Sequence, residues 1–181
     1  MGLGQTMITL GMFILLIMSV ISANRMINEN LQAQLETQAM ATSATVANDL
    51  LLEILSKKYD ASSDTLGSLA TSVFTEASSL GPNATEVANC PQPDSSYTGA
   101  FRSIAAYSDV DDYHGYERIV TANGITGFKL EVVVYYVASG TPDTKTTSRT
   151  NFKRIQVTVK QDQFLTTALK NVPVYTAVAS Y

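Results

Sequence analysis

The stretch GMFILLIMSVISANRMINENLQAQLETQAM, residues 11–40, changes from apolar to polar in its middle without a helix breaker. It is almost wholly apolar up to Ala23. From Asn24 onward it is polar, yet it keeps good helix formers and regularly spaced apolar residues. Neither Gly nor Pro occurs between Asn24 and Lys58. The sequence therefore predicts one continuous helix whose two halves meet different surroundings.

The first half of this helix has the character of a membrane segment. A dense apolar run extends from Met7 to Ala23, and no charged residue occurs between Gly2 and Asn24. With its uncharged flanks the run reaches the length of about 20 residues that a membrane-spanning helix needs. Two simpler interpretations stay open. One is a secretory signal peptide, for which Ser22-Ala23 resembles a cleavage site although no Lys or Arg precedes the apolar run. The other is a single-pass anchor followed by a stalk.

The second half carries apolar residues at steps of four or seven, which is helical spacing. Its last turns, from Leu50 to Leu55, are apolar nearly all round, so we expect neighbours on several sides there. Small side chains in residues 39–47 permit other backbones to approach closely. A helix over residues 5–58 would be about 80 Å long, given the rise per residue of an α-helix. The spaced apolar residues are Ile27, Leu31, Leu35, Ala39, Val46, Leu50 and Ile54.

The last third of the sequence alternates in the manner of β-strands. FKRIQVTVK (152–160) places Ile155, Val157 and Val159 on one face, and FKLEVVVYYVA (128–138) alternates in the same way. The second face of 128–138 is apolar in its far half, so we expect that half to be covered as well. YERIVTA (116–122) and VPVYTAVAS (172–180) are further strand candidates, and SGTPDTKTTSRTN (139–151) is expected to be a loop. The inward set of 128–138 is Phe128, Leu130, Val132, Val134 and Tyr136.

Strands joined by such loops form an antiparallel sheet, and the rear half of the helix is the large apolar element available to cover it. The predicted fold class is therefore α+β, a long N-terminal helix packed on a C-terminal antiparallel sheet. We divide the chain into an apolar half-helix (1–24), an amphipathic half-helix (25–58) and a globular head (59–181). Within the head we expect an irregular connecting region at 59–115, with a short helix around 67–78, and the sheet at 116–181.

Composition argues against several classes of function. The net charge is −4, 15% of the residues are charged, and Lys and Arg form no cluster, so we expect no nucleic-acid partner. Cys90 is the single cysteine, which excludes an internal disulfide; a cross-link between two chains is the alternative. An enzymatic site would have to use His114, the single histidine, yet no nucleophile motif or phosphate loop accompanies it. We expect no enzyme, no catalytic residue and no cofactor.

Two short motifs have both a functional and a structural interpretation. Asp109, Asp111 and Asp112 are clustered oxygen ligands for Ca²⁺, but their spacing departs from that of an EF-hand. The alternative is an Asx-type turn that leads into the strand at Tyr116. Asn83-Ala84-Thr85 matches the acceptor pattern for N-glycosylation, which is common by chance.

The arrangement of a half-apolar helix followed by YERIVTA, FKLEVVVYYV and TNFKRIQVTVK resembles that of type IV pilins and pseudopilins. SDVDDYHGYER (108–118) is similar to an Asp-rich segment before the first strand of some minor pilins. The resemblance implies a structural subunit of an extracellular pilus (fimbrium), a homopolymer whose subunits wait in the inner membrane before assembly and whose filaments serve in cell adhesion. It leaves open a minor pilin or pseudopilin of a secretion machine, and an anchored extracytoplasmic binding module.

In such filaments the apolar half-helices pack together, and Gly11, Ser19 and Ser22 are small enough to permit close contact. The family's signature includes a basic leader and a Glu at the fifth position, which is thought to pair with a neighbouring terminal amine. If Met1 is the first residue of the mature chain, Gln5 stands at that position, and a cut after Gly2 or Gly4 would place no acidic residue there either. A neutral amide is easier to bury than an unpaired carboxylate. Gln5 is therefore expected at the N-terminal contact. The packing set is Met7, Leu10, Gly11, Phe13, Ile14, Ile17, Val20 and Ile21.

Overall fold

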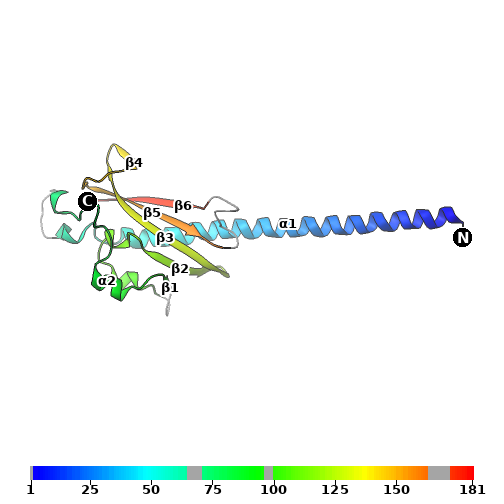
Figure 1. Cartoon of the computed structure of the whole chain (residues 1–181), viewed down its shortest axis with the longest axis horizontal. Helices are drawn as coiled ribbons and strands as arrows, with labels where there is room; N and C mark the ends of the chain where they lie inside the picture. The colour runs from blue at the N-terminus through cyan, green and yellow to red at the C-terminus, as the bar shows by residue number, and fades with distance from the viewer. Residues whose placement is uncertain (1, 65–70, 96–99, 163–171) are drawn as a thin grey trace. The chain divides into compact units, whose positions relative to one another are not determined.

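The computed structural model describes residues 2–64, 71–95, 100–162 and 172–181. One helix, α1 (Leu3–Leu55), confirms the predicted continuous helix and ends three residues before the expected boundary at Lys58 (Figure 1). The chain forms two compact units, Met1–Gln38 and Ala39–Tyr181, so the helix contributes to both. The second unit contains the last turns of α1 and every strand of the described residues. From here on the head means this whole unit, which begins earlier in the chain than the predicted head at 59–181.

The sheet of the head is built around four antiparallel strands, as predicted: β2 (Glu117–Ala122), β3 (Ile125–Ala138), β5 (Phe152–Lys160) and β6 (Val174–Ser180). The strand order is β1-β2-β3-β5-β6. Two short strands were not expected. β1 (Asp94–Ser95) pairs in parallel with β2, and β4 (Thr141–Lys145) pairs with β3 inside the segment 139–151 that was predicted to be a loop. The fold class is therefore α+β with a mostly antiparallel sheet.

The turn between β2 and β3 fixes the sheet to the helix. Asn123 and Gly124 both have positive φ, 51° and 77°, and the flanking residues Ala122 and Ile125 are paired. A two-residue hairpin loop with positive φ at both positions matches the twist of antiparallel strands, and Asn-Gly is the favoured sequence for it. The Nδ2 of Asn123 then donates to the hydroxyl of Thr42 on α1 at 3.0 Å. The hairpin thus lies against the helix.

The core lies between one face of α1 and the inner face of the sheet. Ala39, Ser43 and Ala47 are fully buried and offer little side-chain bulk, while Leu50 and Ile54 continue the same face deeper into the head. The predicted inward residues of β3 and β5 are all buried, at 0–1% exposure. They are Phe128, Leu130, Val132, Val134, Tyr136, Ile155, Val157 and Val159.

Two expectations about coverage are only partly right. On the second face of β3, Val137 is buried but Val133 is 38% exposed, so the far half of that face is covered only at its end. Near the end of α1, Leu52 and Leu55 remain exposed beside the buried Leu51. The last turns therefore have neighbours on part of their circumference within the subunit.

The segment predicted as an irregular connection contains several short elements. These are η1 (Ala61–Asp64), η2 (Thr71–Val73), α2 (Ala84–Asn89), α3 (Ser103–Ala106) and η3 (Asp111–Tyr113). The helix expected around 67–78 is a single 3₁₀ turn at Thr71–Val73, and residues 67–70 lie outside the described residues. Asn83 caps α2: its side chain accepts from the N–H groups of Thr85 and Glu86, and the Glu86 side chain accepts from the Asn83 N–H in return.

An ion pair at the end of α1 joins the helix to β2. Glu53 Oε2 lies 2.6 Å from a guanidinium nitrogen of Arg118, while Glu53 Oε1 accepts from Ser103 Oγ at 2.7 Å and from the Tyr113 hydroxyl at 2.8 Å. The Arg118 side chain is only 4% exposed and its guanidinium lies 3.7 Å from the centre of the Phe101 ring. Removing one partner of such a pair leaves an uncompensated buried charge.

We expect Glu53→Gln to lower the free energy of unfolding by about 3 kcal/mol, because the amide keeps the shape but leaves the Arg118 charge unbalanced. The measurement is urea unfolding of the full chain in mild detergent, followed by near-UV circular dichroism. All nine tyrosines lie from Tyr59 onward and no tryptophan exists, so the tyrosine band of this spectrum reports the head alone.

Glu117→Gln is the matched control. Glu117 pairs with Lys129 at 3.0 Å, but the two side chains are 36% and 40% exposed, so its loss should cost less than about 1 kcal/mol. Equal losses for the two variants would contradict a structural role for the buried pair.

Candidate functional site

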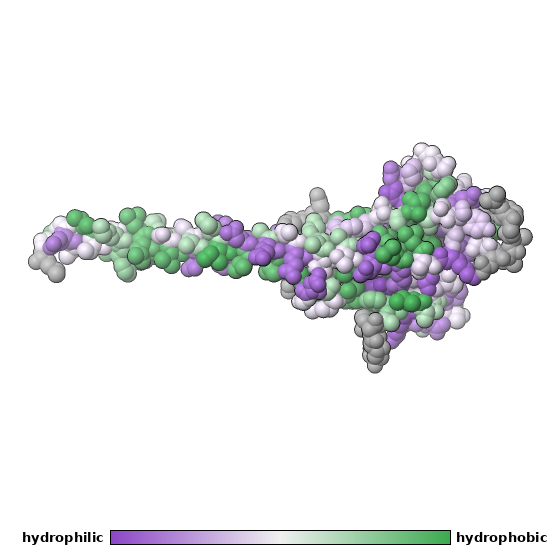
Figure 2. All heavy atoms as spheres, turned by 180° about the vertical axis from the view of Figure 1, so that it is seen from behind, coloured by the Kyte–Doolittle hydropathy of each residue, from purple (hydrophilic) through white to green (hydrophobic). Residues whose placement is uncertain are grey.

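The apolar half-helix offers a continuous exposed surface. From Leu3 to Leu35 no side chain of α1 is buried within the subunit, and this stretch contains the one segment of the described residues that is long and apolar enough to cross a membrane. A signal sequence near an N-terminus has the same properties. Figure 2 shows hydrophobic side chains along the visible face of this segment. The exposed apolar helix suits packing against a membrane or against partner helices.

All side chains of the predicted packing set are exposed, from 42% at Ile17 to 70% at Met7, and a Cβ placed on Gly11 would meet no atom within 4 Å. The apolar surface is not limited to that set. It runs around the whole helix, so no single face is marked as the contact. The packing of this set against other copies stays a prediction. Within the apolar half-helix (1–24), the other large apolar residues that are exposed are Leu3, Ile8, Met12, Leu15, Leu16 and Met18.

The two threonine hydroxyl groups of this half-helix are satisfied by its own backbone. Thr6 Oγ1 donates to the carbonyl of Leu3 at 2.8 Å, and Thr9 Oγ1 lies 3.1 Å from the carbonyl of Gln5 and 3.0 Å from that of Thr6. A hydroxyl that is bonded inside its own helix can enter an apolar environment at low cost. Gln5 lies in the first turn and is exposed, and its role at an N-terminal contact stays a prediction.

The three aspartates proposed as calcium ligands lie together but face protein donors. Asp109 Oδ1 accepts from the N–H groups of Asp111 at 3.0 Å and Asp112 at 3.3 Å. Asp112 Oδ2 accepts from the N–H groups of Ser108 and Asp109. This is the Asx-type turn that the sequence left as the alternative. Within the described residues no group of three His, Cys, Asp or Glu side chains is arranged to hold a metal ion.

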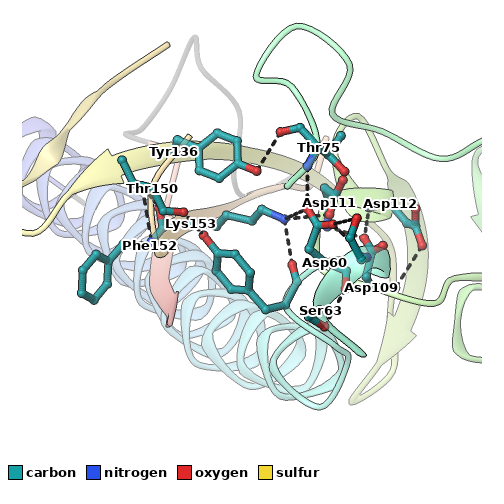
Figure 3. A network of polar contacts seen from close by, with 12 residues as sticks. Asp60, Ser63, Thr75, Asp109, Asp111, Asp112, Tyr136, Thr150, Phe152 and Lys153 are labelled. Atoms are coloured by element: carbon teal, nitrogen blue, oxygen red, sulfur yellow. Dashed lines mark hydrogen bonds and ion pairs between the residues drawn. The ribbon is translucent and has the colours of Figure 1, made fainter. Parts of the chain in front are cut away.

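Asp111 instead faces a buried lysine that the sequence analysis did not single out. Lys153 Nζ lies 2.8 Å from Asp111 Oδ1 and 3.2 Å from Asp60 Oδ2, and it donates to the carbonyl of Tyr59 at 2.7 Å (Figure 3). Its side chain is fully buried. The sequence could have predicted this burial, because residues two apart in a strand share a face and Lys153 therefore lies on the same face as the inward residue Ile155. We call Lys153, Asp60 and Asp111 the buried lysine centre.

Aromatic rings and backbone donors complete the buried lysine centre. The ammonium lies 4.4 Å from the centre of the Tyr59 ring and 5.4 Å from that of Tyr136, and both rings favour a cation. Burial alone would raise the pKa of Asp60. The N–H groups of Thr75 and Ser62, together with Lys153, outweigh burial and hold that pKa below its ordinary value. Asp60 is therefore a stable carboxylate inside the head.

His114 has a structural environment. Its Nδ1 accepts from the backbone N–H of Val134 at 3.1 Å, so this nitrogen must be unprotonated. Burial, with a contribution from nearby Lys145, lowers the pKa of His114 below 6.5. The ring is thus held neutral between η3 and β3.

Cys90 is fully buried at the end of α2, and its thiol lies 3.6 Å from Asp94 Oδ2. Burial is the largest of the causes that raise the pKa of this thiol to about 11. A disulfide between two folded chains through Cys90 is therefore wrong, because a second thiol cannot reach it.

We expect His114 to contribute a loss of stability as the pH falls through about 6.5, so His114→Asn should become more stable relative to the unsubstituted chain over this range. Below this pH the unfolded chain binds a proton on His114 that the folded ring resists, so acid favours the unfolded state. An asparagine oxygen can accept from Val134 and does not titrate. The measurement is the urea midpoint of both proteins at about pH 7.5 and about pH 5.5. Parallel pH dependences of the two midpoints would contradict this role for His114.

Comparison of the chain with protein families, with curated proteins and with solved structures gives no match. The arrangement of the helix and the sheet can still be compared with known architectures. A long helix, apolar and exposed in its first half, packs with its last turns on a mostly antiparallel sheet. This architecture is pilin-like.

Proposed function

We propose that the chain is a structural subunit of an extracellular pilus-like filament and acts without catalysis. The observation that carries the proposal is the apolar first half of α1, which is exposed on all sides in the subunit and continues without a break into the turns that pack in the head. Burial of a Leu, Ile or Phe side chain is worth about 1.5–3 kcal/mol relative to water. A surface of this kind has to be covered by lipid or by other apolar helices.

The apolar half-helix meets two apolar environments, one after the other. Before assembly the apolar half-helix lies in the inner membrane, which anchors the subunit. During assembly it exchanges lipid for other copies of the same helix. Lipid and leucine are equally apolar, so this exchange gains little from the hydrophobic effect and depends on close packing between helices. The finished filament lies at the cell surface, where the heads are available for adhesion.

Two helices pack most closely where one of them carries small residues. Gly11 has open space around its Cα, so a neighbouring backbone can approach it. Ser19 and Ser22 offer similarly small side chains on the same half-helix. Gln5 contributes a hydrogen bond at the N-terminal contact, in place of the ion pair that a carboxylate would make.

Gly11→Leu tests packing separately from anchoring. A leucine at this position meets no atom within 4 Å in the subunit, favours the helix by up to about 1 kcal/mol, and leaves the segment apolar. We therefore expect normal folding and membrane insertion but at least a tenfold loss of filaments, because the close contact is blocked. The measurement is electron microscopy and mass spectrometry of material sheared from cells, with subunit counts in the membrane fraction.

Met12→Leu is the matched control, an apolar exchange at the next residue outside the packing set, and it should leave filaments unchanged. Sheared filaments that lack this chain would contradict the proposal. A chain present only in trace amounts beside another subunit would indicate a minor pilin or pseudopilin. A chain that is always monomeric in detergent would indicate a membrane-anchored binding module.

A further inference from the structure

The buried lysine centre brings an amine and a carboxyl group together without water. Lys153 and Asp60 are fully buried, and the side chain of Asp111 is only 4% exposed. Lys153 Nζ lies 2.8 Å from Asp111 Oδ1, so the nitrogen is in hydrogen-bond contact with the carboxyl group (Figure 3). Attack by the nitrogen requires that the ammonium first lose a proton, and the hydrogen bond to Asp111 is a direct path for that transfer.

A third acid lies beside this pair. Asp109 Oδ1 accepts from the backbone N–H of Asp111 at 3.0 Å, so its carboxyl group lies next to that residue. Burial, followed by the proximity of Asp111, raises the pKa of Asp109 to about 9. Asp109 is therefore more readily protonated than an ordinary aspartate, which suits it as a proton donor to Asp111.

We propose that Lys153 and Asp111 condense to an amide, an isopeptide cross-link between β5 and η3, with the loss of one water molecule. Asp109 is the proton donor for this step, and Asp60 stays a carboxylate that holds the amine in place. The proposal does not depend on assembly into a filament.

The reaction balances with the groups present. The Lys153 ammonium passes one proton to the Asp111 carboxylate along the 2.8 Å hydrogen bond, which leaves a neutral amine and a neutral acid. Nζ attacks Cγ of Asp111 while Asp109 protonates the carbonyl oxygen, so the C–N bond forms and the carbon carries two hydroxyl groups. One proton of the nitrogen returns to Asp109, and one hydroxyl group leaves as water with the proton of the other, which restores the C=O bond. A carboxyl group and an amide have the same oxidation level, so the reaction needs neither an oxidant nor a reductant.

Asp111, and not Asp60, is the carboxyl group suited to attack. Asp60 accepts from the N–H groups of Thr75 and Ser62 and from the Ser62 hydroxyl, which stabilise its negative charge and make its carbon a poor electrophile. Within the described residues the Asp111 carboxyl group is hydrogen-bonded to Lys153, and the Asp109 carboxyl group accepts from the backbone N–H of Asp111. One neighbour supplies the nucleophile and the other withdraws electrons from the carbon.

The test is mass spectrometry of the purified full chain. We expect an intact mass lower than the sequence mass by one water. After denaturation and trypsin digestion, peptide 103–118, which contains Asp111, should be joined to peptide 150–154, which contains Lys153. An unmodified mass with free peptide 103–118, from a chain with native near-UV dichroism, overturns the proposal. Linkage of Lys153 to peptide 59–102, which contains Asp60, overturns the choice of Asp111.

Asp109→Asn tests the proton donor without removing either partner. The amide oxygen still accepts from the N–H groups of Asp111 and Asp112, so the fold should be kept, while the cross-linked fraction should fall at least tenfold. Asp112→Asn, the same change three residues further along the turn, should cross-link like the unsubstituted chain. Full cross-linking in Asp109→Asn overturns the role given to Asp109.

Discussion

The buried face in the last turns of α1 has to be covered by the sheet, and the arrangement of the head follows from that requirement. Ala39, Ser43 and Ala47 let the sheet come close to the helix axis, and Leu50 and Ile54 fill the space farther along. The inner face of β3 and β5 is made mostly of β-branched and aromatic residues, with Lys153 as its buried charged member. The polar hairpin turn at Asn123 and Gly124 can then reach the helix, because the sheet already lies against it.

Charged groups, and not only apolar ones, fix the place where α1 leaves the core. Glu53 binds Arg118 of β2 at one side of the helix end. Lys153 of β5 binds the carbonyl of Tyr59 and the carboxylate of Asp60, just beyond the last turn. Buried ion pairs add little net stability, but a wrong alignment would leave several charges without partners. The two centres therefore select one position of the helix end against the sheet.

Much of this fold was predictable because its signals are local. The helix and four main strands follow from periods of about four and two residues. β4 was missed because Thr141–Lys145 contains a proline and an aspartate, and it forms only where β3 offers an edge. The apolar half-helix was found from length and hydropathy. The carboxylates at 109–112 suggested calcium because the amine that Asp111 faces lies 42 residues away in the chain. A short stretch of sequence shows that acidic residues are clustered, but it does not show that they face the amine of Lys153.

The burial of Cys90 has a practical consequence for visualising the molecule. Its thiol is shielded by the core and is almost entirely protonated at neutral pH, so maleimide reagents react with it only when the end of α2 opens. A cysteine introduced on the exposed hairpin at Thr141–Lys145 would therefore be the single fast-reacting thiol of the chain. Fluorophores could be attached to the head at one chosen place without first replacing the native cysteine.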